Sequence, residues 1–367
     1  MRRFWMMPHK DALTKWIKQF AQALGFELVG VAPVQPPPNA DSFLLWLAQG
    51  YAGTMEYLER TAHLRINPSE LLPDARSAVV VGLNYAPAEL PEVDYRIARY
   101  ALGDDYHEVI RDKLETLLSA LQALVPEVRG RVCVDSAPVL ERDLAMLAGL
   151  GWYGKNTCLI NTHRGSYFFI GVLLLTLELT YDSPAEGGCG TCRLCLDACP
   201  TGALVAPYQL DARKCISYLT IELRDSVPAA LRAPMGEWLF GCDVCQEVCP
   251  FNRPRAHQPL RARPTTEPRL QARPLPTLAE ILQMSESEFA ERFRGSAVKR
   301  AKWRGLVRNA LIVAGNKRDP ALRPLVERFL QHDDPMLRET AAWALQQLQS
   351  CATEPLRYAA ALPESES

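Results

Sequence analysis

The sequence predicts an α/β domain, then a cysteine-rich module and then a helical region. Over the first 180 residues, amphipathic helical periods alternate with short apolar runs, which is typical of α/β domains. Eight of the eleven cysteines fall between positions 182 and 252. Beyond residue 278 the apolar residues follow a helical period. A chain of 367 residues is long enough for two or three domains.

Each element of the first domain has its own signal. Apolar residues three and four positions apart predict helices over 11–24, 104–125 and about 139–147. Apolar runs predict strands over 26–32, 77–85, 131–135 and within 167–179. The last of these holds the most apolar run, Tyr167 to Leu177, which is too short to span a bilayer. We therefore expect no membrane association.

Composition and the amino terminus limit the possible functions. The chain is 48% hydrophobic with a formal net charge of −1, so it has a core and is no polycation. The start "MRRFWMM" holds two arginines, but Pro8 to Asp11 interrupt any apolar signal core. We expect a cytoplasmic protein, because the reducing cytosol keeps thiols free.

The cysteine-rich module has the spacing of a two-cluster ferredoxin. "CGTCRLCLDACP" reads C-x2-C-x2-C-x3-C-P, and "CDVCQEVCP" repeats most of it after an isolated Cys215. In such proteins the fourth cysteine of a run binds the other cluster. The predicted ligands of cluster one are Cys189, Cys192, Cys195 and Cys249. The predicted ligands of cluster two are Cys199, Cys215, Cys242 and Cys245.

Two structural zinc sites are the alternative for these eight cysteines. Zinc favours closed four-cysteine sites made of two separated pairs. A triply spaced run ending in Cys-Pro, present twice, fits iron–sulfur clusters better. The remaining cysteines, Cys133, Cys158 and Cys351, have no such spacing, and we interpret them as small buried hydrophobic residues.

Three motifs of the first domain are ambiguous. "GLGWYG" follows a predicted helix where a dinucleotide site needs a strand, so its glycines indicate a tight turn or a flat cofactor. "DYHEVI" offers Asp105 and His107 but has Ile110 where the cobalamin signature D-x-H-x-x-G needs glycine. We therefore interpret His107 as an ordinary histidine. Asp135 ends a strand, and a helix N-cap is favoured over a ligand-binding role.

The chain divides at its composition changes. We predict domains over 1–180 and 181–255, a proline- and arginine-rich linker over 256–277, a helical domain over 278–352 and a tail over 353–367. "RDPALRPLVERFL" and "DDPMLRETAAWAL" resemble each other, which is typical of HEAT-like helix pairs. An ordinary helical hairpin is the alternative.

Taken together, the motifs resemble those of the epoxyqueuosine reductase family. They are "INPSELLPDARSAVVVGLNY", "VDSAPVLERDLAMLAGLGWYGKNTCLI", the two cysteine groups and "KCISYLTIE", in family order over about residues 12–350. The resemblance implies an α/β cobalamin-binding domain, a ferredoxin-like module with two 4Fe-4S clusters, and a layout similar to reductive dehalogenases. It also implies reduction of epoxyqueuosine to queuosine at the wobble position of tRNA, the last step of queuosine biosynthesis.

The resemblance also implies roles for individual residues. In the family the aspartate of the V-D-[ST] motif donates a proton, and this motif places that role on Asp135. Besides Asp135 itself, further motif positions imply cobalamin contacts at Arg65, Asn156, Ser217 and Asp243. An unidentified electron donor would reduce the clusters, which pass single electrons to the corrin. In the reactive complex we expect an apolar, corrin-covered setting to raise the pKa of Asp135, so that it protonates the leaving oxygen.

Two basic stretches are candidates for binding the tRNA anticodon stem-loop. Residues 253–273 hold six arginines against one glutamate. Residues 292–308 hold no acid and have Trp303 interleaved, and from them we predict tRNA contacts at Lys299, Arg300, Lys302, Arg304 and Arg308. The alternative is a solvated helix face.

Two rival functions remain open from the sequence. One is a reductive dehalogenase-like enzyme for a small molecule, and the other is a ferredoxin-type electron carrier without further catalysis. We also expect a monomer.

Overall fold

The structure is a computed structural model, and it describes residues 9–254 and 263–349. Cys351 and the predicted tail over 353–367 lie outside the described residues. The same holds for residues 256–262 of the predicted linker and residues 350–352 of the predicted helical domain.

A four-stranded sheet forms the centre of the first domain. Its strands are β1 (Leu28–Pro33), β2 (Ser77–Asn84), β7 (Phe168–Leu175) and β4 (Gly130–Val134), in that spatial order. Strands and helices alternate along the chain as predicted. Every neighbouring pair is antiparallel, unlike the parallel sheets that such alternation usually builds.

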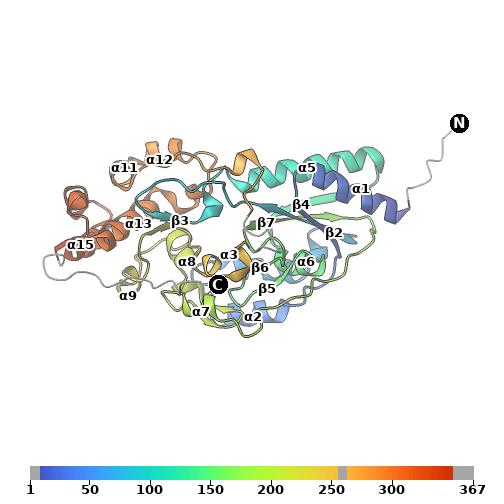
Figure 1. Ribbon diagram of the computed structural model, residues 1–367, viewed down its shortest axis with the longest axis horizontal. Coiled ribbons are helices and arrows are strands. Elements are labelled where there is room, and N and C mark those ends of the chain that lie inside the picture. The colour runs from blue at the N-terminus through green and yellow to red at the C-terminus, as the bar shows by residue number, and fades with distance from the viewer. Residues whose placement is uncertain (1–8, 255–262, 350–367) are drawn as a thin grey trace.

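Helices cover both faces of this sheet. α1 (Lys10–Ala23) and α5 (Tyr106–Leu124) pack on one face and α6 (Glu141–Leu147) on the other, as Figure 1 shows. The period-two pattern of β2 explains the two layers, because Val79 and Val81 join one apolar cluster and Ala78 and Val80 the other. The sheet is therefore buried on both faces, and its loops carry the polar groups.

The loop after β4 differs from the sequence prediction. α6 begins at Glu141 with Leu140 at its N-cap, so Asp135 caps no helix and that prediction is wrong. Asp135 instead follows the strand directly with a left-handed backbone, φ 44°. Its side chain is therefore available to the space beyond the strand end.

Smaller elements surround the sheet. They are α2 (Ala40–Ala48), α3 (Glu56–Arg60), α4 (Ala62–Ile66), η1 (Pro68–Glu70), η2 (Arg99–Ala101), β5 (Trp152–Tyr153) and β6 (Leu159–Ile160). β3 (Arg96–Ile97) leaves the first domain to pair with a strand of the cysteine module, β10 (Trp238–Phe240). A two-stranded parallel sheet therefore joins the first domain to the cysteine module.

The cysteine module consists of short elements joined by turns. They are α7 (Leu194–Asp197), β8 (Leu204–Ala206), β9 (Gln209–Leu210), η3 (Ala212–Lys214), α8 (Ile216–Ile221), α9 (Ala229–Arg232), α10 (Val244–Glu247) and η4 (Pro250–Asn252). Each C-x2-C group begins just before a one-turn helix, α7 or α10, so its cysteines gather on one side.

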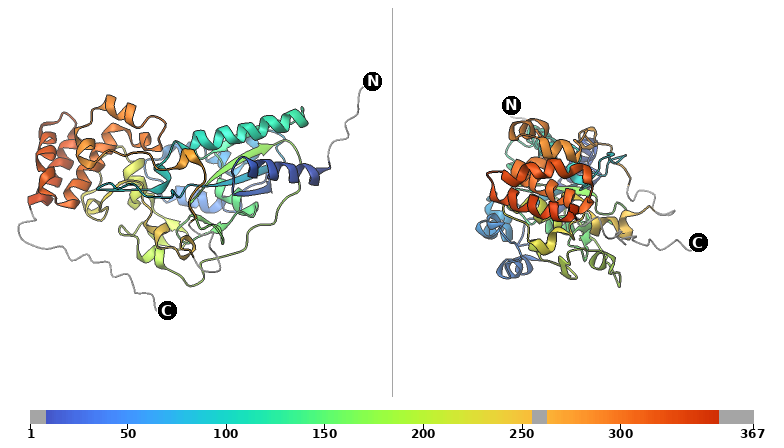
Figure 2. Two further views of the ribbon diagram at one scale, coloured as in Figure 1. Left: turned by 45° about the horizontal axis from the view of Figure 1, so that its top comes forward. Right: turned by 90° about the vertical axis from the view of Figure 1, so that its left-hand side faces the viewer.

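The carboxyl-terminal region is helical, as predicted. After η5 (Pro268–Leu270), its elements are α11 (Leu278–Gln283), α12 (Glu286–Arg292), η6 (Ala297–Ala301), α13 (Lys302–Lys317), η7 (Pro320–Leu322), α14 (Arg323–Glu327), η8 (Arg328–Gln331) and α15 (Pro335–Gln349). Figure 2 shows this region at one end of the molecule and the sheet toward the other. None of the described helices combines the length and apolar character that crossing a bilayer requires.

Candidate active site

A pocket opens beside the end of β4, where Asp135 lies. Its empty volume is about 830 Å³, and five aromatic side chains line it together with polar groups. The aromatic residues are Tyr85, Tyr100, Tyr106, Phe168 and Phe169, and the polar ones include Asp135, Glu141, Arg142 and Gln246. Broad aromatic walls with a few polar groups are typical of a site for a flat organic cofactor or substrate.

Two neighbouring residues at the start of α5 hold the carboxylate of Asp135. Tyr106 donates its hydroxyl proton to Asp135 Oδ2 over 2.7 Å. His107 Nε2 lies 3.0 Å from the same oxygen. The Asp135 side chain is still 54% exposed, so this oxygen is held by protein while the carboxyl group faces the open pocket.

A second carboxylate fixes the orientation of His107. His107 Nδ1 lies 2.7 Å from Asp105 Oδ1, and Asp105 is also the N-cap of α5. Lys299 of η6 approaches Asp105 within 3.3 Å. The imidazole therefore bridges a nearly buried carboxylate and the one that faces the pocket.

This arrangement determines where the proton lies. Burial alone would lower the pKa of His107, but the hydrogen bonds to Asp105 and Asp135 raise it to about 9. Burial would raise the pKa of Asp135, but the hydrogen bonds from His107 and Tyr106 outweigh it, and the pKa is lowered. The raised pKa expected for Asp135 concerns the corrin-covered reactive complex and stays a prediction. Near neutral pH the proton is on His107.

Sequence reasoning missed Tyr106 and His107. The signal was present in "DYHEVI", where Asp105 and His107 stand in the D-x-H spacing. Because the motif lacks its glycine, we interpreted His107 as an ordinary histidine. The fold gives these residues a different role, since α5 begins beside the end of β4.

The four cysteines predicted for cluster one surround one cavity. Its lining contains these four thiols together with Asn156, Ile160, Leu194, Pro250 and Phe251. Burial raises the pKa of Cys195 to about 11, and the charges of Cys189, Cys249 and Cys192 add to this effect. Four thiols around one apolar cavity fit a 4Fe-4S cluster, because bound iron would stabilise the thiolates.

The four cysteines predicted for cluster two are also electrostatic neighbours. Burial raises the pKa of Cys242, with further contributions from the charges of Cys215 and Cys199. Cys245 is influenced in the same way by Cys242 and Cys215. Within residues 9–254 and 263–349, no three His, Cys, Asp or Glu side chains converge tightly enough to hold a single metal ion.

Asn156 and Cys158 connect the cluster module to the pocket. Asn156 lines the cluster-one cavity and donates from Nδ2 to the carbonyl oxygen of Cys245 over 3.3 Å. The thiol of Cys158 lines the Asp135 pocket, and Cys158 and Cys245 are close enough to influence each other's pKa. Cys158 is therefore more than the small hydrophobic residue that we predicted. Among the predicted cluster-two ligands, Cys245 is therefore next to a residue of the pocket lining.

The four predicted cobalamin contacts have internal partners. Arg65 donates to the carbonyl oxygen of Val139, and Asp243 accepts from the backbone N–H of Arg99 over 2.8 Å. Ser217 hydrogen-bonds to the thiol of Cys215, and Asn156 has the contacts given above. None of the four belongs to the described lining of the Asp135 pocket. Their assignment to cobalamin stays a prediction.

One predicted tRNA contact is wrong. Arg308 is fully buried and donates to the carbonyl oxygens of Leu219, Leu223 and Asp225. Its neighbour Asn309 donates to Thr220 and Leu239 in the same way. Arg308 therefore joins α13 to the segment that follows Cys215, and it cannot reach a phosphate group.

The other four basic residues lie nearer the surface. Arg300 forms a bidentate ion pair with Glu222, with N–O distances of 2.9 and 2.8 Å, and Arg304 pairs with Asp334. Lys299 contacts Asp105, and Lys302 is exposed. Residues 292–308 contain no acidic residue. Three acidic side chains from other elements, Glu222, Asp334 and Asp105, nevertheless pair with its basic side chains.

Two family models match this chain. One is described as epoxyqueuosine reductase QueG, DUF1730, and matches residues 65–136, which contain Arg65, His107 and Asp135. The other is described as a 4Fe-4S double cluster binding domain and matches residues 188–252, which contain all eight predicted cluster ligands.

Similar proteins cover nearly the whole chain. An epoxyqueuosine reductase of Escherichia coli is 40% identical over 349 residues, covering 92% of this chain and 90% of the relative. A crystal structure of epoxyqueuosine reductase with an epoxyqueuosine-modified tRNA-Tyr stem loop matches with a TM-score of 0.84 at 30% identity, covering 92% and 90% of the two chains.

A structure of the Bacillus subtilis epoxyqueuosine reductase also matches, with a TM-score of 0.83 at 30% identity and the same coverage. It is described as having a catalytic aspartate loop swung out of the active site. The family prediction made from the motifs is confirmed, and this chain belongs to the epoxyqueuosine reductase family of oxidoreductases.

Proposed function

We propose that this protein reduces epoxyqueuosine to queuosine at the wobble position of tRNA, using cobalamin and two 4Fe-4S clusters. The observation that carries the proposal is the contact between Asp135 and His107 at the edge of an aromatic pocket, with the Cys158–Cys245 contact on the cluster side of that pocket. Asp135, the proposed proton donor, and Cys158, next to the predicted cluster-two ligand Cys245, therefore border the same pocket.

The overall reaction needs two electrons and two protons. They convert the epoxide into an alkene, and its oxygen leaves as water. An alkoxide is a poor leaving group, so a positioned acid accelerates C–O cleavage, typically by about 10²–10⁴-fold. The residues of this chain that supply the acid are therefore central to the reaction.

We assign the proton to the His107–Asp135 pair. His107 holds the proton at neutral pH, and Asp135 faces the pocket. The epoxide oxygen takes a proton through Asp135 while His107 replaces it. Tyr106 fixes the carboxylate in position by its 2.7 Å hydrogen bond. The pair therefore works as a relay, and Asp135 stays the proton donor that the motif implied.

The pocket fits a flat macrocycle by its shape and chemistry. Its aromatic walls offer apolar surface to a ring, and Arg142, Glu141 and Gln246 offer polar groups to its amide rim. Bound cobalamin would supply low-potential electrons to the substrate. The clusters suit the delivery of those electrons one at a time, because their potentials span a wide range.

The helical region is proposed to bind the tRNA. Lys299 and Lys302 lie at the boundary of η6 and α13, and Lys299 contacts the Asp105 that orients His107. A phosphate group near these lysines would bring the anticodon loop close to the pocket. The mutual packing of α13 and α15 supports a HEAT-like arrangement. We place the reaction in the cytoplasm, where thiolates stay reduced.

The decisive experiment is conversion of epoxyqueuosine-containing tRNA by the anaerobically reconstituted protein, followed by nucleoside analysis. Queuosine formation that depends on both cobalamin and reductant supports the proposal. Unchanged epoxyqueuosine, in a sample with full iron content and bound cobalamin, contradicts it. The absorption spectrum of the same sample separates an enzyme from a ferredoxin-type carrier, because a carrier binds no corrin.

A further inference from the structure

Three exposed apolar side chains lie on neighbouring elements of the cysteine module, because α7 packs against β8. They are Leu194 of α7, Val205 of β8 and Tyr208 of the turn between β8 and β9, and we name them the cluster-one patch. Their exposed fractions are 49%, 41% and 53%. Exposed apolar side chains that gather at one place indicate an interaction surface.

Contacts through Lys155 join this patch to the predicted ligands of cluster one. The backbone N–H of Tyr208 donates to the carbonyl oxygen of Lys155 over 3.0 Å. The backbone N–H of Lys155 donates to Cys189 Sγ over 3.4 Å, and its ammonium group donates to the carbonyl oxygens of Gly190 and Cys192. Lys155 therefore contacts both Tyr208 and Cys189, a predicted ligand of cluster one.

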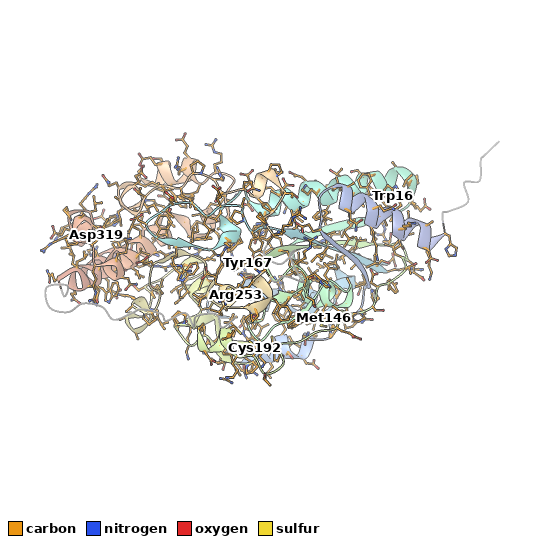
Figure 3. All side chains as sticks on the ribbon, in the orientation of Figure 1. Trp16, Met146, Tyr167, Cys192, Arg253 and Asp319 are labelled. Carbon is orange, nitrogen blue, oxygen red and sulfur yellow. The ribbon has the colours of Figure 1, made fainter. Side chains whose placement is uncertain are left out.

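The loop around Cys189 is open on its outer side. A side chain added at Gly188, Gly190 or Gly202 would meet no other atom within 4 Å. Leu194 both lines the cluster-one cavity and is half exposed. Figure 3 shows Cys192 at the lower edge of the molecule. A partner could therefore approach cluster one closely.

One predicted ligand of cluster two lies beside the Asp135 pocket. The predicted cluster-two ligand Cys245 contacts Cys158, which lines the Asp135 pocket. The predicted cluster-one ligands lie under the patch. Electrons that reach the pocket through cluster two would then pass through cluster one, whose cavity is lined by the half-exposed Leu194.

We propose that the cluster-one patch is the docking surface for a small one-electron carrier protein that reduces cluster one. This inference rests on the proposed function, which requires an external electron source. The patch consists of three side chains, and electron-transfer encounters use interfaces at the low end of the size range. The neighbouring charges are already paired with each other, Arg193 with Asp197 and Arg213 with Asp211, so the contact is mainly apolar.

The test measures the reduction of the clusters by stopped-flow absorbance, with reduced bacterial flavodoxin as the carrier. The patch variant combines Val205→Glu with Tyr208→Asn. Asparagine suits the left-handed backbone of Tyr208, φ 67°. Leu194 is left unchanged because it lines the cluster cavity. The matched control is Leu124→Glu at the end of α5, a residue with 53% exposure outside this module.

We expect the patch variant to need about tenfold more flavodoxin for half-maximal reduction, which is the loss typical of an interface residue worth more than 1 kcal/mol. Dithionite, a small reductant, should reduce the variant, the control and the wild type at equal rates. The control should behave as wild type with flavodoxin.

Two results would overturn the proposal. One is a patch variant whose flavodoxin requirement stays within twofold of wild type. The other is a wild-type protein that dithionite reduces but that neither flavodoxin nor a 2Fe-2S ferredoxin reduces. Because this assay contains no tRNA, a failure of the proposed function would show only in the conversion assay and would leave the docking result intact.

Discussion

The imidazole of His107 contacts the carboxylate of Asp135 over 3.0 Å, across 28 positions of sequence. The contact joins the start of α5 to the loop after β4 at the edge of the pocket. The contact keeps His107 protonated and Asp135 ionised near neutral pH, because the pKa of His107 rises to about 9 while that of Asp135 falls.

Asp135→Asn tests the delivery of the proton. An amide cannot transfer a proton to the epoxide oxygen, so we expect turnover with excess reductant to fall by about 10²–10⁴-fold. Nucleoside analysis of the tRNA measures the loss, and iron content and corrin absorbance show whether the cofactors remain bound. Turnover close to wild type in a fully loaded variant would exclude the acid role.

His107→Gln tests the source of the proton through the pH profile. In the wild type we expect single-turnover rates in the pre-reduced enzyme to fall as pH rises through about 9, where His107 loses its proton. The variant should be slower at neutral pH and should lack this alkaline limb. A variant with the same alkaline limb as wild type would show that another group supplies the proton.

The same pair makes stability depend on pH. The pKa of His107 is raised in the folded state, so its contribution is complete below the unfolded value of about 6.5 and is lost as pH rises through about 9. The difference in free energy of unfolding between wild type and His107→Gln should therefore shrink over this window, by on the order of 2 kcal/mol. Chemical denaturation at pH 6.5 and pH 9.5 measures it, and an unchanged difference contradicts the assignment.

Cysteine substitutions test how the ligands are grouped. Cys249→Ser should remove the cluster held by the first run, although Cys249 belongs to the second group in sequence. Cys215→Ser should remove the other cluster. Iron content and electron paramagnetic resonance of each reduced variant distinguish the two losses. Cys133→Ser is the matched control, and it should keep the full iron content.

Arg308→Met separates a structural arginine from an RNA contact. The substitution leaves the carbonyl oxygens of Leu219, Leu223 and Asp225 without this donor, and we expect a loss of about 3 kcal/mol in the free energy of unfolding. Lys302→Met on the exposed start of the same helix should change stability by less than about 0.5 kcal/mol.

Lys302→Gln tests the proposed RNA surface. Removing one phosphate contact should reduce the slope of log affinity against log salt by about 1. Titration of an anticodon stem-loop at several salt concentrations measures this slope. An unchanged slope would place the RNA elsewhere on the protein.

The sequence predicted the features that depend on short-range spacing. The cysteine groups are local patterns, and the continuous apolar run over 77–85 indicates the buried strand that forms β2. The partners of Asp135 were not predictable in this way, because Tyr106 and His107 come from another element. The lowered pKa of Asp135 depends on these contacts, so residue spacing could not predict it either.

The basic stretch shows the same limit. Its composition indicates an exposed cationic face, and Lys302 fits that reading. The partners of Arg308 lie more than 80 positions earlier in the chain, so nothing near it in sequence distinguishes it from its exposed neighbours. Charge alone therefore could not separate the buried arginine from the exposed lysine.

The anchoring of α13 to the cysteine module bears on how this protein can be divided for experiments. A fragment that stops at the proline-rich segment would lose Arg308 and Asn309, and with them the donors to five carbonyl groups around α8 and β10. The proline-rich segment is therefore not a boundary at which the protein can be truncated without losing these contacts. Iron incorporation and RNA affinity have to be studied in one intact polypeptide, even though the alternating composition suggests separable modules.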